Sequence, residues 1–256
     1  MGLKRLEEKV IVISGGTKGV GRAFAEVAGR EGAKVVIGGR DEKAGKEVVR
    51  NIRTSGSDGI FVYTDLLKVD DCKHLFDVGF EKYGKIDGFF NYAGVTPVSP
   101  LDTCDEKTFD WVTDVNYKAA FFCCQQSIKY MRMNGGGSIV FTGSAHAWGG
   151  QKDRAAYAMT KGVLRILNEH IAHQYASEHI RCNYLTLGWT PTEGEVNLRL
   201  SQGENEAELR KRAAEILPMG RMCERSDYME ALVYLFSDAS IMMTGSVFRI
   251  TAGEYI

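Results

Sequence analysis

The sequence predicts a single α/β domain with a doubly wound, seven-stranded parallel sheet and helices on both of its faces. Short β-branched runs alternate with longer amphipathic stretches along the whole chain, which implies βαβ units with right-handed crossovers. The strand runs are continuously apolar rather than alternating, as is typical of a sheet covered on both faces. No Pro/Ser-rich linker interrupts the pattern, so we expect residues 1–256 to form one domain.

The alternation assigns each element to a segment of the chain. The expected strands are Val10–Ser14, Lys34–Ile37, Gly59–Thr64, Ile86–Asn91, Ser138–Thr142, Ile180–Thr186 and Ser246–Ile250. The expected helices are Gly19–Glu31, Glu42–Thr54, Val69–Tyr83, Glu106–Met133, Arg154–Glu178 and Ser226–Ser237. Residues 192–219 depart from the alternation because they are polar, charged and helix-prone over Glu204–Leu217. Their place after the sixth strand predicts a substrate lid, with an ordinary surface insertion as the alternative.

Composition excludes several classes of partner. The formal net charge is -1 without a long basic or acidic block, so no nucleic acid and no anionic membrane surface is expected as a partner. The N-terminus has no apolar stretch suited to a signal peptide, and no run approaches the roughly 20 apolar residues of a membrane span. We therefore expect a cytoplasmic protein.

Cysteine and histidine patterns predict no metal site and no disulfide framework. The six cysteines form no C-x-x-C pair and are expected to be buried free thiols. Cys123 and Cys124 are adjacent, which leaves a redox switch as the alternative. His170 and His173 share a helix at i, i+3, but no carboxylate–histidine cluster completes a metal site. We expect both to be surface histidines.

Glycines cluster where the first expected strand meets the first expected helix. The junction reads Ser14-Gly15-Gly16-Thr17-Lys18-Gly19-Val20-Gly21. Glycines at such a turn let the backbone approach a pyrophosphate, and the helix N-terminus supplies free N–H groups and a partial positive charge. The strand–turn–helix context predicts a Rossmann-type dinucleotide site. Its expected residues are Gly15, Thr17, Lys18, Gly19, Val20 and Gly21.

The end of the second expected strand indicates which dinucleotide binds. An NAD enzyme places a carboxylate there for the ribose 2′-OH, whereas an NADP enzyme places a cation for the 2′-phosphate. Gly39 stands at the acidic position, Arg40 follows it, and Lys18 is basic too. Arg40 can bind a phosphate through two planar hydrogen bonds, while Lys18 acts as a point charge. The pattern favours NADP(H), with two solvated surface charges as the alternative; Asp41 is expected beyond the strand, facing water.

Tyr157 and Lys161 are the expected acid–base pair. They lie four residues apart on an expected helix, so their side chains share one face. A free tyrosine has a pKa of about 10, and a nearby ammonium stabilises its phenolate. Ser144, at the end of the fifth strand, can hydrogen-bond a substrate oxygen. The three side chains predict proton transfer at that oxygen.

These features together resemble the short-chain dehydrogenase/reductase family over essentially the whole chain. The glycine turn has the family's G-x-x-x-G-x-G spacing, and Asn116, Ser144, Tyr157 and Lys161 match its Asn-Ser-Tyr-Lys tetrad. The resemblance implies the strand order 3-2-1-4-5-6-7, a preference for NADP(H), and a homotetramer built partly on residues 106–133 and 154–178. It also implies an oxidoreductase that interconverts a ketone and a secondary alcohol.

The resemblance assigns a role to each member of the tetrad. Tyr157 is the general acid or base, Ser144 holds the substrate oxygen, and Lys161 holds the nicotinamide ribose. Asn116 holds a water that links Lys161 to solvent. Further cofactor contacts are implied for Asp65, Leu66, Asn91, Ala93, Gly94, Gly188, Thr190 and Thr192. The chain departs from the usual family residues at Tyr92, Gly143, Leu187 and Thr251-Ala252-Gly253, which leaves the tetrad whole and affects the pocket floor and subunit contacts.

The substrate is less constrained than the chemistry. His146, Trp148 and Trp189 are expected to wall the pocket, with loop or packing roles as the alternative. The polar run Gln151-Lys152-Asp153-Arg154 could recognise a hydroxylated or anionic substrate. A sugar or polyol, a hydroxysteroid or a small ketone would fit, and we favour a polyhydroxylated or ring alcohol. The rivals are a 3-oxoacyl-thioester reductase of the same family, a non-catalytic NADP-binding regulator and an extended-family epimerase.

Overall fold

The computed structural model of the protein describes residues 4–149, 152–201 and 203–254. Within these residues seven parallel strands form one sheet in the order β3-β2-β1-β4-β5-β6-β7, which confirms the expected order. The strands are β1 (Val10–Ser14), β2 (Lys34–Gly39), β3 (Gly59–Tyr63), β4 (Gly88–Asn91), β5 (Gly137–Ser144), β6 (Ile180–Leu187) and β7 (Val247–Ile250). Gln151, part of the polar run singled out in the sequence, lies outside the described residues.

Helices lie between successive strands along the chain. They are α1 (Gly19–Arg30), α2 (Glu42–Thr54), α3 (Val69–Tyr83), α4 (Glu106–Thr113), α5 (Ala119–Met133), α6 (Ala155–Gln174), α7 (Glu193–Ser201), α8 (Glu206–Ile216) and α9 (Met229–Phe236). A turn of π-helix, η1 (Asp114–Lys118), joins α4 to α5. Short 3₁₀ turns are η2 (Ala145–Ala147), η3 (Ala176–Glu178), η4 (Arg225–Tyr228) and η5 (Asp238–Ser240).

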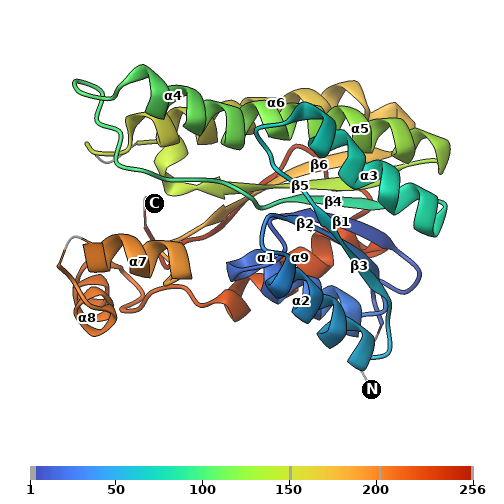
Figure 1. The fold of residues 1–256 in the computed structure, drawn as a ribbon, viewed down its shortest axis with the longest axis horizontal. Coiled ribbons are helices and arrows are strands. Elements are labelled where there is room, and N and C mark those ends of the chain that lie inside the picture. Colours follow the sequence, from blue (N-terminus) through green and yellow to red (C-terminus); the bar gives the residue numbers. More distant parts are fainter. Residues whose placement is uncertain (1–3, 150–151, 202, 255–256) are drawn as a thin grey trace.

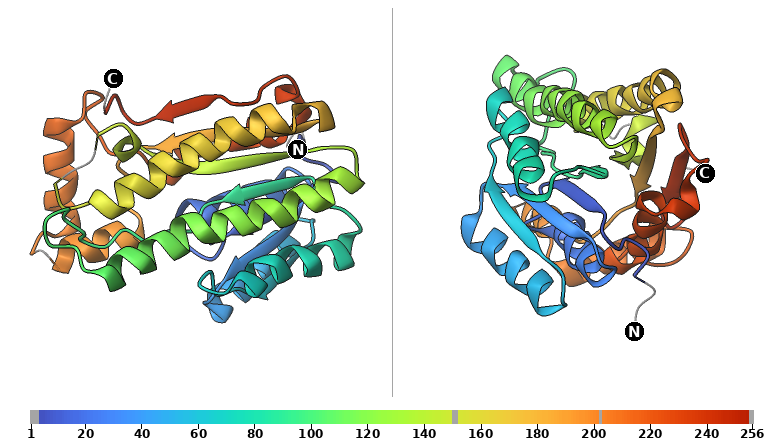
Figure 2. Two further views of the ribbon diagram at one scale, coloured as in Figure 1. Left: turned by 90° about the horizontal axis from the view of Figure 1, so that it is seen from above. Right: turned by 90° about the vertical axis from the view of Figure 1, so that its right-hand side faces the viewer.

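Two helical layers bury the sheet. Helices α3, α5 and α6 cover one face, and α1, α2 and α9 cover the other (Figures 1 and 2). Successive residues of β1 point to opposite layers: Ile11 and Ile13 pack in the core beside α1, whereas Val10 and Val12 pack in the core beside α3 and α5. All four are buried. Because helices cover both faces of the sheet, side chains on both sides of each strand are apolar, and the strands are continuous apolar runs in the sequence.

The central strands run further than the sequence pattern predicts. β5 continues to Ser144 and β6 to Leu187, and these two residues are partners in the register. The sequence pattern does not predict this extension, because Gly143 and Leu187 are not β-branched and so do not continue the strand pattern. The extension brings Ser144 to the carboxyl edge of the sheet, which is the edge where parallel α/β sheets bind ligands.

The expected helix 106–133 is not continuous. The π turn η1 interrupts it, and Asn116 is the buried residue of that turn. Its side chain is bonded to the backbone of Val95, on the loop after β4. Residue periodicity within the helix cannot predict a contact between two residues so far apart in the sequence. Single π turns inside α-helices are frequent at functional sites.

Residues 192–219 contain α7 and α8, which lie beside the carboxyl edge of the sheet (Figure 1). A capping box between Asn205 and Glu208 starts α8, and Leu209 and Ala213 are buried in the core. The element is therefore anchored by α8. Among the residues that the structure describes, no helix has the length and apolarity needed to cross a bilayer.

Five of the six cysteines are buried and all six are free, whereas Cys104 is partly exposed. The bonded Cys72 thiol and burial raise the pKa of Cys123, and burial alone raises that of Cys124. Both thiols are therefore held in the unreactive protonated form. His170 and His173 are exposed, as expected.

Candidate active site

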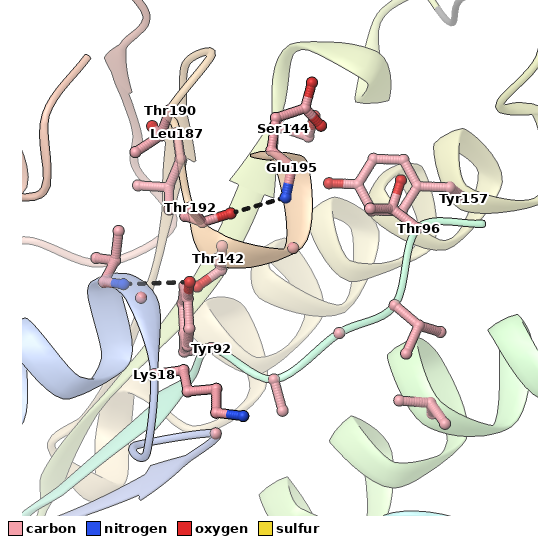
Figure 3. A pocket seen from close by; sticks show the side chains of 18 of the residues that line it. Lys18, Tyr92, Thr96, Thr142, Ser144, Tyr157, Leu187, Thr190, Thr192 and Glu195 are labelled. Carbon is pink, nitrogen blue, oxygen red and sulfur yellow. Dashed lines mark hydrogen bonds between the residues drawn. The ribbon is translucent and has the colours of Figure 1, made fainter. Parts of the chain in front are cut away.

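A cavity of about 500 Å³ opens at the carboxyl edge of the sheet. Figure 3 shows Lys18 and Tyr92 at one end of it and Ser144, Thr96 and Tyr157 at the other. The first end is the glycine turn between β1 and α1, and the second is the meeting point of β5 and α6. A cavity of this size, joining a glycine-rich turn to an acid–base pair, suits a dinucleotide and a small substrate.

Tyr92 supports the glycine turn. Its hydroxyl accepts a hydrogen bond of 3.1 Å from the Val20 N–H, in the first turn of α1. A Cβ on Gly19 would collide with this hydroxyl, and a Cβ on Gly21 would lie 2.5 Å from both the Tyr92 ring and the Gly15 carbonyl oxygen. The tyrosine that replaces the usual family asparagine thus fills the space that these glycines leave. It also uses one of the N–H groups at the start of α1.

The N-terminus of α1 keeps other N–H groups for an anion. Lys18, the N-cap residue, makes no side-chain capping hydrogen bond. Gly15 has a positive φ of 78°, and a Cβ there would lie 2.9 Å from Ala93. The hydroxyl of Thr142, which lines the cavity further along, is buried without a hydrogen-bond partner. A close-approaching turn, free N–H groups and an orphaned hydroxyl fit a bound pyrophosphate and ribose.

At the end of β2, the two expected cations have different surroundings. Arg40 is exposed, lines the cavity and has no ion pair among the described residues. Lys18 also lines the cavity, but its ammonium lies 3.1 Å from an Asp41 carboxylate oxygen. Asp41 accepts a hydrogen bond from the Ala44 N–H at 3.0 Å and so caps α2. The Ala44 N–H and then Lys18 lower the pKa of Asp41, so this carboxylate is charged.

Most of the predicted cofactor residues line one cavity. Those that do are Gly15, Thr17, Lys18, Gly19, Val20, Arg40, Asp65, Leu66, Ala93, Gly94, Tyr157, Lys161, Gly188, Thr190 and Thr192. Gly21 and Asn91 are buried outside the lining. Asn91 accepts a hydrogen bond of 3.2 Å from the Ser14 hydroxyl, which joins β4 to β1 beneath the turn.

Tyr157 and Ser144 meet at the far end of the cavity. Both side chains line the cavity there, and the Ser144 hydroxyl is near enough to the Tyr157 phenol to affect its ionisation. Burial raises the pKa of Tyr157, and the Ser144 hydroxyl and the charge of Arg154 oppose that rise. Ser144 also accepts a hydrogen bond of 3.3 Å from the His146 N–H, which fixes the turn η2. A hydroxyl pair of this kind can hold one oxygen atom and exchange a proton with it.

Lys161 lies one helical turn beyond Tyr157 and is buried. Its ammonium is 5.6 Å from the centre of the Tyr157 ring and donates a hydrogen bond of 2.8 Å to the Thr142 carbonyl. Burial lowers the pKa of Lys161 to about 8. At neutral pH the side chain is therefore mostly charged, and its charge favours the phenolate form of Tyr157.

Asn116 holds the loop that forms one wall of the cavity. Its Oδ1 accepts a hydrogen bond of 2.7 Å from the Val95 N–H, and its Nδ2 donates to the Val95 carbonyl at 2.8 Å. Nδ2 also donates to the Thr160 hydroxyl at 3.2 Å, next to Lys161. Both N–H groups of the side chain therefore bond to protein atoms, and they tie the loop after β4 to α6.

Tyr184 is a site residue that the sequence did not reveal. It lies on β6, fully buried, and its hydroxyl accepts a hydrogen bond of 3.3 Å from the Ser144 N–H. The same hydroxyl donates to the Lys161 carbonyl at 3.0 Å. One phenol therefore connects the backbones of two tetrad residues. The signal that could have found it is Gly143, where the usual serine is missing.

The three aromatic residues expected to contact substrate divide into two groups. His146 lines the cavity, and its ring meets that of Tyr157 edge to face at 5.8 Å. Trp189 lines it too, and its indole N–H donates to Glu195 at 2.8 Å. Trp148 lies outside the lining and is 42% exposed, and the Arg249 guanidinium lies 4.5 Å from the centre of its ring.

Comparison with known proteins decides the family. A family model described as enoyl-(acyl carrier protein) reductase matches residues 15–254. The chain belongs to the short-chain dehydrogenase/reductase family. A 3beta-hydroxysteroid dehydrogenase of Mediterraneibacter gnavus is 36% identical over 218 residues, covering 85% of this chain and 76% of its own. A 7alpha-hydroxysteroid dehydrogenase of Clostridium sardiniense is 30% identical over 254 residues, covering 98% of this chain and 95% of its own.

A solved structure shares the whole architecture. The crystal structure of a 3-ketoacyl-(acyl-carrier-protein) reductase from Brucella melitensis, complexed with NADH, is 26% identical with a TM-score of 0.88. The match covers 98% of this chain and 100% of that one. As a member of the short-chain dehydrogenase/reductase family, the protein is an oxidoreductase that binds a nicotinamide dinucleotide, NAD(H) or NADP(H), and acts on alcohols.

Proposed function

We propose that this short-chain dehydrogenase/reductase interconverts a ketone and a secondary alcohol of a ring, with NADP(H) as cofactor and Tyr157 as general acid or base. The observation that carries the proposal is the arrangement of Ser144, Tyr157 and Lys161. The Tyr157 phenol and the Ser144 hydroxyl line the end of a dinucleotide-sized cavity, with the buried Lys161 ammonium 5.6 Å from the centre of the tyrosine ring. Such a set serves proton transfer at the oxygen whose carbon exchanges a hydride.

Each of the three side chains has one task. When bound, the cofactor supplies the hydride for reduction and accepts one in the reverse direction. Ser144 donates a hydrogen bond to the substrate oxygen, and Tyr157 gives that oxygen a proton in reduction or takes one in oxidation. The buried ammonium of Lys161 stabilises the phenolate that remains.

The preference for NADP(H) rests on the end of β2. Gly39 offers no carboxylate to a ribose 2′-OH, and a Cβ there would lie 2.9 Å from the Thr17 side chain. Arg40 is exposed at the cavity mouth and is free to bind a 2′-phosphate through two hydrogen bonds. Lys18 shares its charge with Asp41, so Arg40 contributes the larger part of the preference.

A ring alcohol fits the substrate end best. Its walls include Trp189, His146 and Tyr157, which combine flat apolar surface with a few polar groups. Two relatives are named as hydroxysteroid dehydrogenases, which act on ring alcohols. Residues 192–219 serve as the substrate lid in this proposal, since Thr192, Glu193, Gly194, Glu195 and Arg199 line the cavity from above.

We propose the homotetramer of the family for the assembly. Helices α4, α5 and α6 expose large apolar side chains that a monomer would leave in water: Phe109, Phe121, Met133, Met159, Val163 and Ile166. Exposed apolar side chains gathered on neighbouring helices mark interaction surfaces. Light scattering after size exclusion measures the assembly; a monomer would contradict this part of the proposal.

A substrate panel tests the function. The protein is mixed with NADPH and ketones, or with NADP+ and secondary alcohols, and the nicotinamide absorbance is followed. Turnover of ring ketones or ring alcohols is expected. The description of the family model and the solved reductase structure favour a second candidate, a 3-oxoacyl-thioester reductase. Faster turnover of an acetoacetyl thioester than of any ring ketone would favour that candidate. Binding of NADPH without any turnover would favour a regulator.

A further inference from the structure

Tyr92 places a phenol hydroxyl at the end of the cavity where α1 begins. The residue follows β4 directly and lines the cavity together with Gly19 and Val20. Its ring packs against the core, with its centre 5.8 Å from that of the Phe90 ring. Its hydroxyl accepts a hydrogen bond of 3.1 Å from the Val20 N–H (Figure 3). Packing of the ring and the bond at its tip fix the position of the hydroxyl oxygen.

The direction of this hydrogen bond leaves the hydroxyl hydrogen of Tyr92 for another partner. An amide N–H can only donate, so the phenol oxygen is the acceptor and its own hydrogen is still available. In the described part of the chain, no carbonyl or carboxylate oxygen accepts that hydrogen. The Glu193 carboxylate lines the same cavity but is bonded to Arg225 at 2.9 Å. The hydroxyl is therefore a donor without a protein acceptor, at the wall of the cavity.

This hydroxyl keeps its proton at neutral pH. Burial raises the pKa of Tyr92, the Val20 N–H opposes that rise, and the charge of Glu193 adds to it. A protonated phenol can donate a hydrogen bond, and a bond to an ionised oxygen is roughly twice as strong as one to a neutral oxygen. The start of α1, where the glycine turn lies, is also where a dinucleotide places its pyrophosphate. A donor and an anion thus meet at this end of the cavity.

We propose that Tyr92 is a ligand of the cofactor pyrophosphate: its oxygen accepts the Val20 N–H, and its hydroxyl donates a hydrogen bond to a pyrophosphate oxygen. The phenol bridges helix and cofactor through space that Gly19 and Gly21 leave open, since a Cβ on either glycine would collide with Tyr92. Asparagine, the usual family residue here, is shorter and would leave the Val20 N–H to bind the anion directly. This role rests on the dinucleotide binding that the proposed function includes, and not on the substrate or on the choice between NADP(H) and NAD(H).

Removal of the hydroxyl tests the bridge. The Kd of NADPH or NADH, whichever the wild type binds more tightly, is measured by nicotinamide fluorescence. In Tyr92→Phe the Kd is expected to rise at least ~10-fold, because a hydrogen bond to a charged group is lost and the ring still covers the Val20 N–H. Tyr63→Phe, at an exposed tyrosine outside the cavity lining, is the matched control and keeps the wild-type Kd. An unchanged Kd in Tyr92→Phe overturns the proposal, and a lower Kd would show that the phenol competes with the cofactor for the Val20 N–H.

Competing ligands identify the group that the hydroxyl binds. Inorganic pyrophosphate and adenosine are each used to displace the cofactor from the wild type and from Tyr92→Phe. The inhibition constant of pyrophosphate is expected to rise at least ~10-fold in the variant, and that of adenosine to change by less than about 2-fold. Equal changes for the two ligands would show that the substitution disturbs the whole cavity, and would overturn the role of the hydroxyl.

Tyr92→Asn separates the hydroxyl from the ring. This variant is expected to bind the cofactor more tightly than Tyr92→Phe does, because the shorter side chain uncovers the Val20 N–H for the pyrophosphate. Weaker binding by Tyr92→Asn than by Tyr92→Phe would assign the effect to packing of the ring and overturn the bridge. Absence of cofactor binding by the wild type would overturn the dinucleotide site, and with it the proposed function, so the two failures are distinguishable.

Discussion

The ring of Tyr184 occupies the space that a side chain at position 143 would need. A Cβ placed on Gly143 would overlap the Tyr184 ring carbons, so the two residues form a complementary pair across β5 and β6. Serine is usual at this position in the family. In this protein the phenol ring of Tyr184 fills the space that the serine side chain would occupy. That phenol links the Ser144 N–H to the Lys161 carbonyl.

The pair predicts a non-additive effect on stability. Gly143→Ser lowers the free energy of unfolding by about 1–3 kcal/mol, because the added atoms overpack a closed core. Adding Tyr184→Ala to Gly143→Ser removes the overlap, so the double variant loses less than the sum of the two single losses. Urea denaturation of the four proteins measures this coupling. Simple additivity would show that the two side chains do not compete for one space.

Tyr184→Phe isolates the hydroxyl from the ring. We expect kcat to fall about 3- to 30-fold, because Ser144 and Lys161 lose a shared anchor, each hydrogen bond contributing about 1 kcal/mol. The KM for NADPH is expected to stay within about 2-fold, since the hydroxyl touches neither end of the cofactor cavity directly. Steady-state kinetics separates the two parameters. A changed KM with an unchanged kcat would assign Tyr184 to cofactor binding.

The buried charge of Lys161 is expected to serve the reaction and to lower the free energy of unfolding. Its folded pKa of about 8 lies below the ordinary 10.5, so between these values the unfolded chain binds more protons and stability rises with pH. Below pH 8 the full cost of burying the charge is present. Lys161→Met removes that cost and gains about 2 kcal/mol at pH 7 after loss of the bond to Thr142.

Denaturation of wild type and Lys161→Met across pH 7–10.5 measures this gain. The difference between them should shrink as the pH rises from about 8 to 10.5, because the wild-type lysine becomes neutral in both states. A difference that is constant with pH would show that packing, and not charge burial, separates the two proteins.

Substitutions of the neighbouring residues Arg40 and Asp41 are predicted to change the KM for NADPH in opposite directions. Arg40→Ala raises the KM for NADPH about 10- to 100-fold and leaves that for NADH nearly unchanged, since the 2′-phosphate loses its charge-assisted bonds. Asp41→Asn keeps an oxygen for capping α2 but releases Lys18, so the KM for NADPH falls several-fold. Kinetics with both cofactors gives the ratios. Equal effects of Arg40→Ala on NADPH and NADH would refute the assignment of Arg40.

Local patterns and long-range contacts explain what the sequence could and could not predict. The alternation of strands and helices and the shared helix face of Tyr157 and Lys161 follow from periodicity and motif spacing, which are local, whereas the strand order was implied by the family resemblance. The π turn at Asn116 depends on its bonds to Val95, 21 residues earlier, and has no periodic signal. From the sequence, Tyr184 is an ordinary strand residue; its role depends on its contact with Gly143 on the neighbouring strand.

Two further differences have the same origin. The sequence places Trp148 either in the pocket wall or in a packing role; in the structure it lies outside the cavity lining and packs against Arg249, far along the chain. Asp41 lies beyond β2 with an exposed side chain, as expected, but it also caps α2 and pairs with Lys18, which the sequence did not predict. In each case the partner that fixes the side chain lies in another element.

Tyr157→Phe tests the central claim most directly. The variant keeps the ring and removes the hydroxyl at the end of the cavity where Ser144 also lies. We predict that kcat for ketone reduction falls about 10²- to 10⁴-fold, the usual share of a general acid. NADPH binding, followed by nicotinamide fluorescence, should change by less than about 3-fold. Full turnover by Tyr157→Phe would contradict the account, because the proton would then come from another group.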